Sequence, residues 1–253
     1  MISIDRVYQK VLALANKEQR GYITPQEFNL FASHAQMDIF DQYFYDLEQR
    51  QRGPGNEFDY ADMVGNIEEK ISNFERYDVQ VSHHGSVGKV DVSSYITDLY
   101  KMGTVRVEYA AFGTGVLGRF VAEEIQLKEL SNYALSPLAT WSRARPVYTR
   151  FHTGSVKLRI QVFPYPIGDD SVYISYVRKP SKPNWTYLIS GSNTKAALYN
   201  PHDAYHQDFE LHKSEENNLV VKILQLAGVA IKDFNIVQMA AQEEANISQQ
   251  QKQ

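Results

Sequence analysis

Residues 156–162, VKLRIQV, alternate apolar and polar side chains at every position. A period of two is typical of a β-strand with one face buried and the other exposed. Residues 172–176, VYISY, repeat this alternation, and Gly168-Asp169-Asp170 between the two segments is typical of a turn. Residues 76–212 are therefore predicted to form a β-rich body built on an antiparallel sheet or sandwich. Alternation of the same kind marks further strands at residues 77–81, 90–92, 105–109 and 185–189.

The preceding residues, 1–75, carry a helical pattern instead. Residues 4–17 place apolar side chains at helical spacing, which predicts a short amphipathic helix. A second helix is expected to begin at residues 24–27, TPQE, whose threonine and glutamate have the spacing of a capping box and whose proline suits the first helical position. Further helices are predicted at residues 60–74 and 127–135. Helices followed by a sheet and then by helices make the chain an α+β protein.

Residues 213–253 form a C-terminal segment of two predicted helices and a glutamine-rich tail. The first helix is expected to begin at Ser214, whose hydroxyl can accept a hydrogen bond from a free amide, and to end at Gly228. The second is expected to begin at Asp233. Its apolar stripe allows another helix to approach closely, so we predict that it contacts a partner protein. The residues predicted to form this partner interface are Phe234, Ile236, Val237, Met239, Ala240 and Ile247.

Composition excludes several classes of function. With 253 residues, 43% of them apolar, the chain can bury a sizeable core. Its net charge of -4 gives no overall attraction for nucleic-acid phosphates. The lack of cysteine excludes disulfides, thiolate metal sites and cysteine nucleophiles. No stretch approaches the ~20 apolar residues that span a bilayer, and the first residues lack the pattern of a signal peptide, so we expect a soluble protein made in a cytosol.

Tyrosine is unusually frequent, with 17 residues against 2 tryptophans. A tyrosine ring is apolar while its hydroxyl can stay in water, so tyrosines suit half-buried surfaces. These side chains are expected to face outward from the sheet or to form contacts between subunits.

Residues 16–27, NKEQRGYITPQE, have the length of a calcium loop, with glycine at the sixth position and glutamate at the twelfth. The fifth position, where calcium requires an oxygen ligand, is Arg20, whose positive charge repels the ion. A turn at Gly21 followed by a helix cap accounts for the same residues, and we prefer that interpretation.

Residues 113–118, GTGVLG, match the glycine pattern of a dinucleotide-binding loop and follow a predicted strand. That site needs a helix directly after the third glycine and an acidic residue about 20 positions later. The next residues, 119–125, instead fit the return strand of a hairpin, and positions 132–134 hold no acid. We therefore interpret 113–118 as a flexible loop between two strands.

His202 and His206 have the spacing of two zinc ligands on a helix, with His212 further along. A metalloprotease needs glutamate directly after the first histidine, but Asp203 occupies that position. The preceding Asn200 and Pro201 also indicate a loop. We therefore predict hydrogen-bonded or solvated histidines, with no metal and no other cofactor. No other catalytic motif is found in the sequence, so we predict that the chain is not an enzyme.

A cationic run interleaved with aromatic residues spans positions 141–185. Such interleaving can bind nucleic acid. In a chain that is acidic overall, cations that protect sheet edges or contact an acidic neighbour are the preferred explanation. The cations are Arg143, Arg145, Arg150, Arg178, Lys179 and Lys182.

Several stretches in both halves of the chain resemble virion structural proteins of short-tailed phages, including crAss-like and marine phages. Residues 78–125 contribute little to this likeness. In the first half the similar stretches are 4–8 (IDRVY), 21–29 (GYITPQEFN) and 35–40 (AQMDIF). In the second half they are 136–138 (SPL), 145–148 (RPVY), 176–180 (YVRKP), 183–185 (PNW) and 208–212 (DFELH).

The resemblance implies a ring subunit of the head-to-tail connector, an adaptor or neck protein beneath the portal that forms part of the genome passage. It implies a homo-oligomer with twelve-fold symmetry that contacts the portal protein and the adjacent tail or neck proteins. Genomic DNA then passes through the lumen without sequence-specific binding, and no membrane is involved. The location implied is the virion, at the head-tail junction or in the tail, after assembly in the host bacterial cytoplasm.

Other functions stay open at this point. A tail tube or another tail ring protein is the first alternative. A calcium-binding or helix-binding regulatory module is the second, based on residues 16–27 and the final helix. A metallohydrolase that uses the three histidines, or a nucleotide-dependent enzyme that uses residues 113–118, is a further possibility.

Overall fold

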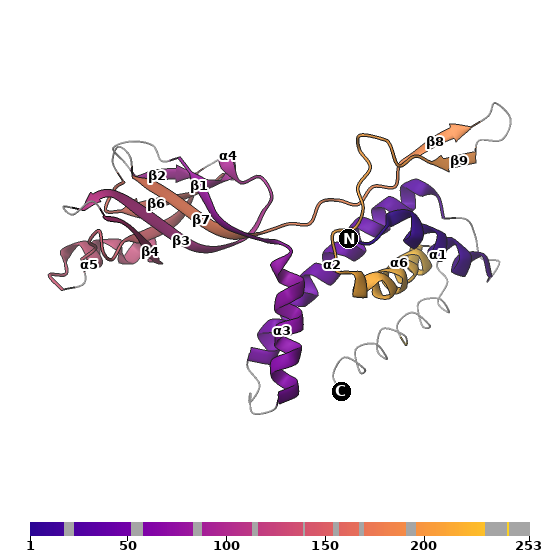
Figure 1. Cartoon of the computed structure of the whole chain (residues 1–253), viewed down its shortest axis with the longest axis horizontal. Helices are drawn as coiled ribbons and strands as arrows, with labels where there is room; N and C mark the ends of the chain where they lie inside the picture. Colours follow the sequence, from indigo (N-terminus) through magenta and orange to yellow (C-terminus); the bar gives the residue numbers. More distant parts are fainter. Residues whose placement is uncertain are drawn as a thin grey trace. The chain divides into compact units, whose positions relative to one another are not determined.

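The chain is an α+β protein, as predicted, and its contacts divide it into two compact units (Figure 1). The helical unit combines Met1–Asn73 with Pro180–Gln253, and the sheet unit is Phe74–Lys179. Residues 180–212, which the sequence analysis assigned to the β-rich body, thus belong with the helices. The computed structural model describes residues 1–17, 23–51, 58–82, 88–112, 116–138, 140–153, 157–166, 170–190 and 196–230, together with residue 242.

In the helical unit, two N-terminal helices pack against a C-terminal helix. Helices α1 (Ile4–Lys17) and α2 (Pro25–Gln51) both contact α6 (Glu216–Ala230), while α3 (Phe58–Ser72) packs against α2. The first three helices lie where the sequence predicts them. The unit also contains a short 3-10 helix, η3 (Lys213–Glu215), and a hairpin formed by β8 (Tyr187–Ser190) and β9 (Ala196–Tyr199).

The core of the helical unit follows from the apolar spacing of its helices. Ile4, Val7 and Val11 recur along one side of α1 and are fully buried. The backbone of Ile2 exchanges two hydrogen bonds with that of Phe209, each 3.1 Å long, which fixes the N-terminus to the segment before α6. Further buried residues come from α2 (Phe28, Ala32, Ala35, Ile39 and Phe40) and from α6 (Leu219, Ile223 and Ala227).

The predicted capping box at the start of α2 is confirmed. The Glu27 amide donates to Thr24 Oγ1 at 3.3 Å, and the Thr24 amide donates to Glu27 Oε2 at 3.0 Å. The Thr24 hydroxyl also donates to this carboxylate, at 2.7 Å. The hydroxyl and amide bonds from Thr24 lower the pKa of Glu27, because both favour its ionised form. The glutamate of the calcium-like loop therefore serves as part of a helix cap.

The predicted limits of the first C-terminal helix are wrong at both ends. The Ser214 hydroxyl was expected to cap this helix. Instead, the Ser214 amide donates to His212 Nδ1 at 3.3 Å, so His212 caps η3. Helix α6 begins only after η3, at Glu216. At its other end α6 continues past Gly228 to Ala230. Glycine costs a helix about 1 kcal/mol relative to alanine, and the buried apolar side of α6 outweighs that cost.

The sheet unit is built on one seven-stranded sheet in the order β1-β7-β3-β4-β5-β6-β2. Most neighbouring strands are antiparallel, as predicted, but β4 and β5 are parallel, so the sheet is mixed. Parallel neighbours require a crossover, and here it contains η2 (Leu127–Glu129) and α5 (Leu130–Leu135), where the sequence predicts a helix. A short helix, α4 (Val92–Tyr95), follows β2. The strands are β1 (Glu75–Val81), β2 (Lys89–Asp91), β3 (Leu99–Phe112), β4 (Val116–Glu124), β5 (Val147–Thr153), β6 (Lys157–Phe163) and β7 (Ser171–Arg178).

The alternation seen in the sequence separates the two faces of this sheet. Residues that pair across β1, β7, β3 and β4 form rows, and neighbouring rows lie on opposite faces. The core-face row consists of Val79, Ile174, Val105 and Ala122, and the outer-face row beside it consists of Gln80, Tyr173, Arg106 and Val121.

Candidate functional site

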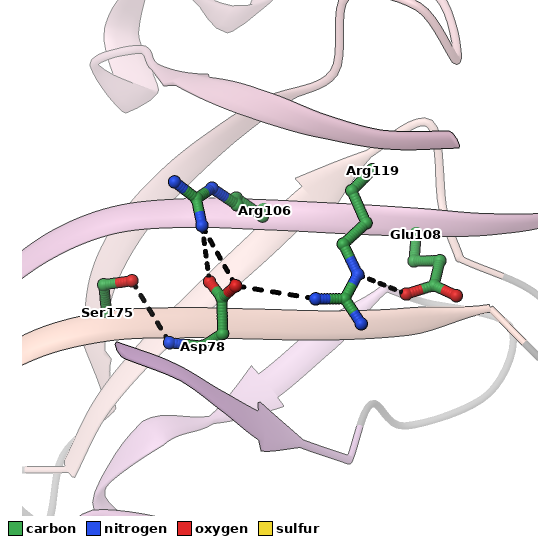
Figure 2. Close-up of polar contacts among 5 residues, drawn as sticks. All are labelled: Asp78, Arg106, Glu108, Arg119 and Ser175. Atoms are coloured by element: carbon green, nitrogen blue, oxygen red, sulfur yellow. Dashed lines mark hydrogen bonds and ion pairs between the residues drawn. The ribbon is translucent and has the colours of Figure 1, made fainter. Parts of the chain in front are cut away.

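A network of charged side chains lies on the outer face of the sheet, centred on Asp78 of β1 (Figure 2). The Asp78 carboxylate accepts hydrogen bonds from Arg106 at 2.8 and 3.0 Å, and Arg119 lies 3.5 Å away. Arg119 also donates through Nε to Glu108 at 2.7 Å, and its guanidinium carbon lies 4.2 Å from the centre of the Tyr173 ring. The hydrogen bond to Glu108 raises the pKa of Arg119, because it favours the cation.

The backbone of β1 turns Asp78 toward these arginines. Asp78 has a positive φ of 49°, a conformation that aspartate adopts more readily than most residues. It lies in a β-bulge, where the pairing of β1 with β7 slips between Arg76 and Val79. The Asp78 amide donates to Ser175 Oγ of β7 at 3.3 Å (Figure 2). The bulge therefore places a carboxylate between two cations of β3 and β4.

The composition of this network favours a structural role. It combines two arginines with two carboxylates, so its charges compensate one another. Arginine stays protonated in proteins and cannot act as a base, and both carboxylates already accept hydrogen bonds from guanidinium groups. β1 is an edge strand, and a bulge with charged side chains hinders pairing with another sheet. We therefore interpret the network as protection of this edge.

The β8–β9 hairpin has the opposite character. Its two strands carry no charged residue, and it extends away from α1, α2 and α6 (Figure 1). Leu188 pairs with Leu198 on one face, and Ile189 pairs with Ala197 on the other. Leu188, Ile189 and Leu198 are 60%, 65% and 54% exposed. A two-stranded hairpin buries little of its own surface, so this one presents apolar side chains to solvent on both faces.

Trp185 fixes the base of the hairpin to the helices. Its indole N–H donates to Asp5 Oδ1 at 3.0 Å, and its backbone N–H donates to Asn29 Oδ1 at 2.8 Å. Trp185 is 3% exposed, and its ring stacks against those of Tyr187 and Tyr199, with centroid distances of 5.8 and 5.7 Å. The hairpin thus begins at a firmly held base while the rest of its strands stays uncovered.

A second polar cluster is buried within the helical unit. Lys70 Nζ of α3 binds Glu215 Oε1 at 2.7 Å, with side-chain exposures of 22% and 4%. Asn218 donates to the other carboxylate oxygen at 3.1 Å. Burial raises the pKa of Tyr43, and the nearby Glu215 charge raises it further, since both disfavour the phenolate. This cluster connects α3 with the start of α6.

The histidines of the predicted zinc alternative have separate roles. His206 Nε2 lies 3.4 Å from the Tyr199 hydroxyl and 3.6 Å from Asp208 Oδ1. His212 caps η3, and His202 lies in a turn. In the part of the chain that the structure describes, no group of three or more histidine, aspartate and glutamate side chains is placed to hold a metal ion.

The two loop motifs lie partly outside the described residues. Residues 113–115 lie outside them, but β4 begins at Val116 and pairs with β3. A strand therefore follows the glycine loop, as expected, and the helix that a dinucleotide site requires is not formed there. Residues 18–22 of the calcium-like loop also lie outside the described part.

The cations of the 141–185 run are divided between the two units, because Lys182 belongs to the helical unit and the others to the sheet unit. Arg150 pairs with Glu124 at 2.7 Å. Arg143 and Arg178 lie over aromatic rings. Several members of the run thus have partners within the protein. The predicted partner interface of Phe234, Ile236, Val237, Met239, Ala240 and Ile247 lies outside the described residues and stays a prediction.

The sequence did not predict two distinctive surfaces of the protein, the β8–β9 hairpin and the charged network at Asp78. It predicted a strand at 185–189 but not its partner β9, because residues 196–199, AALY, show no polar alternation. Two uncharged segments on either side of residues 191–195, GSNTK, are a hairpin signal that would have found it. The bulge at Asp78 gave no such signal, because a polar residue between Tyr77 and Val79 fits a regular strand equally well.

No protein-family model matches the chain, and comparison with curated proteins finds no match. None of the described helices is both long enough and apolar enough to cross a membrane.

Proposed function

We propose that the chain is a structural protein of a phage virion that assembles into a homo-oligomeric ring of the head-to-tail connector, beneath the portal. The observation that carries the proposal is the β8–β9 hairpin, which exposes uncharged apolar side chains on both faces above a fixed base. The phage setting is supported by the stretches that resemble virion proteins, such as residues 21–29 and 176–180. In this role the chain is not an enzyme and uses no cofactor.

Covering the hairpin supplies part of the energy of assembly. Burial of a large aliphatic side chain is worth about 2 kcal/mol, so covering three side chains that are roughly 60% exposed yields about 3–4 kcal/mol. Loss of translational and rotational freedom on association costs about 4–15 kcal/mol. The hairpin is therefore one part of a larger contact, as expected for obligate interfaces, which commonly bury more than about 2,000 Å².

The partners in this proposal are further copies of the chain in a twelve-fold ring, the portal protein and the adjacent tail or neck proteins. Genomic DNA passes through the lumen without sequence-specific binding, which fits a net charge of -4. A tail tube or another tail ring uses the same self-association and differs only in the layer of the virion that it forms.

Purified virions test the proposal. Quantitative mass spectrometry should find the chain in a copy number equal to that of the portal protein, and cryo-electron microscopy should place it at the head-tail junction. Presence along the whole tail would favour the tail-tube alternative instead. Absence of the chain from purified virions would refute the proposal.

A further inference from the structure

A cavity of about 280 Å³ in the helical unit is lined by α3 and by residues at η3. Its lining combines Asn66, Glu69 and Lys70 of α3 with His212, which caps η3, and Ser214 within it. Helical residues three and four positions apart lie on the same side, so the three α3 side chains project together. The volume is close to the lower end of the range for ligand sites, about 300–1,000 Å³, so the cavity has space for one small molecule.

Lys70 supplies a fixed cation to this cavity. Its ammonium group has three N–H donors, and the group binds the Glu215 carboxylate at 2.7 Å. The same nitrogen lies 5.6 Å from the centre of the Tyr43 ring, which also favours a cation. A lysine held in this way has already lost much of its side-chain freedom. A ligand that accepts another of its N–H groups therefore does not bear the entropy cost of ordering it.

Glu69 supplies the opposite charge. It is exposed, and none of the described residues pairs with its carboxylate. Asn66 and Ser214 add oxygen atoms that can accept hydrogen bonds. The charge of Glu216, which follows η3, is already compensated by two cations of α1. The carboxylate of Glu69 is therefore the acidic group that this lining offers to a ligand.

His212 adds a further donor. Its Nδ1 accepts the Ser214 amide at 3.3 Å, so the proton of the neutral ring lies on Nε2. The Ser214 hydroxyl lies 2.9 Å from the same Nδ1, and the two contacts hold the ring in place. The Nε2–H group can then donate to a molecule in the cavity that the ring lines. The lining thus combines two donors, Lys70 and His212, with one carboxylate, Glu69.

We propose that this cavity binds a small zwitterion, a molecule with one carboxylate and one ammonium group such as a free α-amino acid. The carboxylate of the ligand accepts hydrogen bonds from Lys70 and His212, and its ammonium group donates to Glu69. Glu69 and Glu215 would repel a simple anion, and Lys70 would repel a simple cation. A molecule with both charges is matched by both sides of the site. This inference does not depend on ring assembly.

Three ligands with one skeleton test the charge pattern in the intact chain. Alanine carries both charges, alaninamide keeps only the ammonium group, and N-acetylalanine keeps only the carboxylate. Each is titrated at constant ionic strength while the backbone amide NMR signals of Lys70 and Ser214 are followed. Alanine should shift both signals to saturation. Each of the other two ligands should bind at least about tenfold more weakly, because it lacks one charge-assisted contact.

Two variants of adjacent glutamates test the acidic side of the site. Glu69→Gln should weaken the binding of alanine at least about tenfold, and it should not weaken that of N-acetylalanine, because it removes a repulsive charge. Glu68→Gln is the matched control, since Glu68 is an exposed residue of α3 outside the cavity lining. In this control both affinities should stay within about twofold of the wild type. Both substituted residues are exposed, so the far-ultraviolet circular dichroism should not change.

Each other outcome overturns the proposal. Alaninamide that binds as tightly as alanine would show a site for cations, and N-acetylalanine that does so would show a site for anions. A lack of saturable shifts with all three ligands would show that the cavity is not a binding site for this class. Equal losses of alanine affinity in Glu69→Gln and Glu68→Gln would show that Glu69 does not hold the ammonium group. The virion experiment decides the proposed function separately from all of these results.

Discussion

Replacement of Lys70 with methionine should strongly destabilise the helical unit. Methionine retains much of the volume of lysine but leaves the Glu215 carboxylate, 4% exposed, without its cation. Removal of one partner from a buried ion pair costs about 3–5 kcal/mol, and the lower end applies here because the Lys70 side chain is 22% exposed and partly reached by water. We therefore expect the free energy of unfolding to fall by about 3 kcal/mol.

A second substitution at the partner should reverse part of this loss. Glu215→Gln removes the buried charge but keeps an oxygen that can accept the hydrogen bond from Asn218, so alone it should cost only about 1–2 kcal/mol. The double variant Lys70→Met/Glu215→Gln contains neither an unpaired carboxylate nor an unpaired ammonium group. It should therefore be more stable than Lys70→Met alone by about 1 kcal/mol or more.

The two tryptophans allow the helical unit to be followed by itself. Trp185 lies in the helical unit and Trp141 in the sheet unit, so a Trp141→Phe background leaves the buried Trp185 as the only indole fluorophore. Urea unfolding at pH 7 in this background gives the free energy for each variant. A change for Lys70→Met within about 0.5 kcal/mol, the range of ordinary surface substitutions, would refute the reasoning. So would a double variant less stable than Lys70→Met.

Three further predictions concern the backbone and the helix cap. Thr24→Ala should cost about 1 kcal/mol through loss of the α2 cap. This substitution should also let the pKa of Glu27 rise toward its ordinary value, as measured by NMR titration. Because folding lowers this pKa, the stability linked to Glu27 is present above the unfolded-state pKa and is lost as pH falls through the folded-state pKa. A pKa of Glu27 that is the same in Thr24→Ala as in the wild type would contradict the capping box. Asp78→Gly should be less destabilising than Asp78→Ala by about 1 kcal/mol, because both substitutions remove the carboxylate but only glycine adopts the φ of 49° freely. Urea unfolding followed by Trp141 fluorescence in a Trp185→Phe background measures the difference. Equal losses of unfolding free energy in the two variants would argue against the bulge. Gly88→Ala should lower the unfolding free energy, measured in the same background, by about 2 kcal/mol. The φ of Gly88 is 58°, and a Cβ there would lie 2.7 Å from the Val162 carbonyl oxygen. An unchanged unfolding free energy would show that β2 does not approach β6 in this way.

Elements with one continuously buried face were predictable from the sequence. Helix α1 was found because Ile4, Val7 and Val11 recur at helical spacing, and β6 and β7 were found because their apolar residues alternate. The start of α2 was also correct, since Thr24 and Glu27 form the capping box within four adjacent residues. In each case the physical cause of the element lies within the segment itself.

Features that depend on distant residues were not predictable in the same way. The parallel pairing of β4 with β5 depends on how the crossover through α5 returns the chain to the sheet, and the alternation in either strand does not encode direction. The bulge at Asp78 depends on Arg106 and Arg119 of other strands. The extension of α6 past Gly228 depends on packing against α1 and α2, which outweighs local propensity.

The two contrasting sheet edges of this protein bear on its association. At β1 the edge is bulged and its outward carboxylate is paired with arginines, which hinders addition of a strand. At the β8–β9 hairpin no described strand borders either edge, and both faces carry exposed aliphatic side chains without charge. An exposed apolar hairpin is an aggregation hazard unless something covers it, and the same chain protects the edge of its larger sheet. In the proposed function a partner covers this hairpin in the assembled state, and the uncharged leucine face favours an apolar surface on that partner.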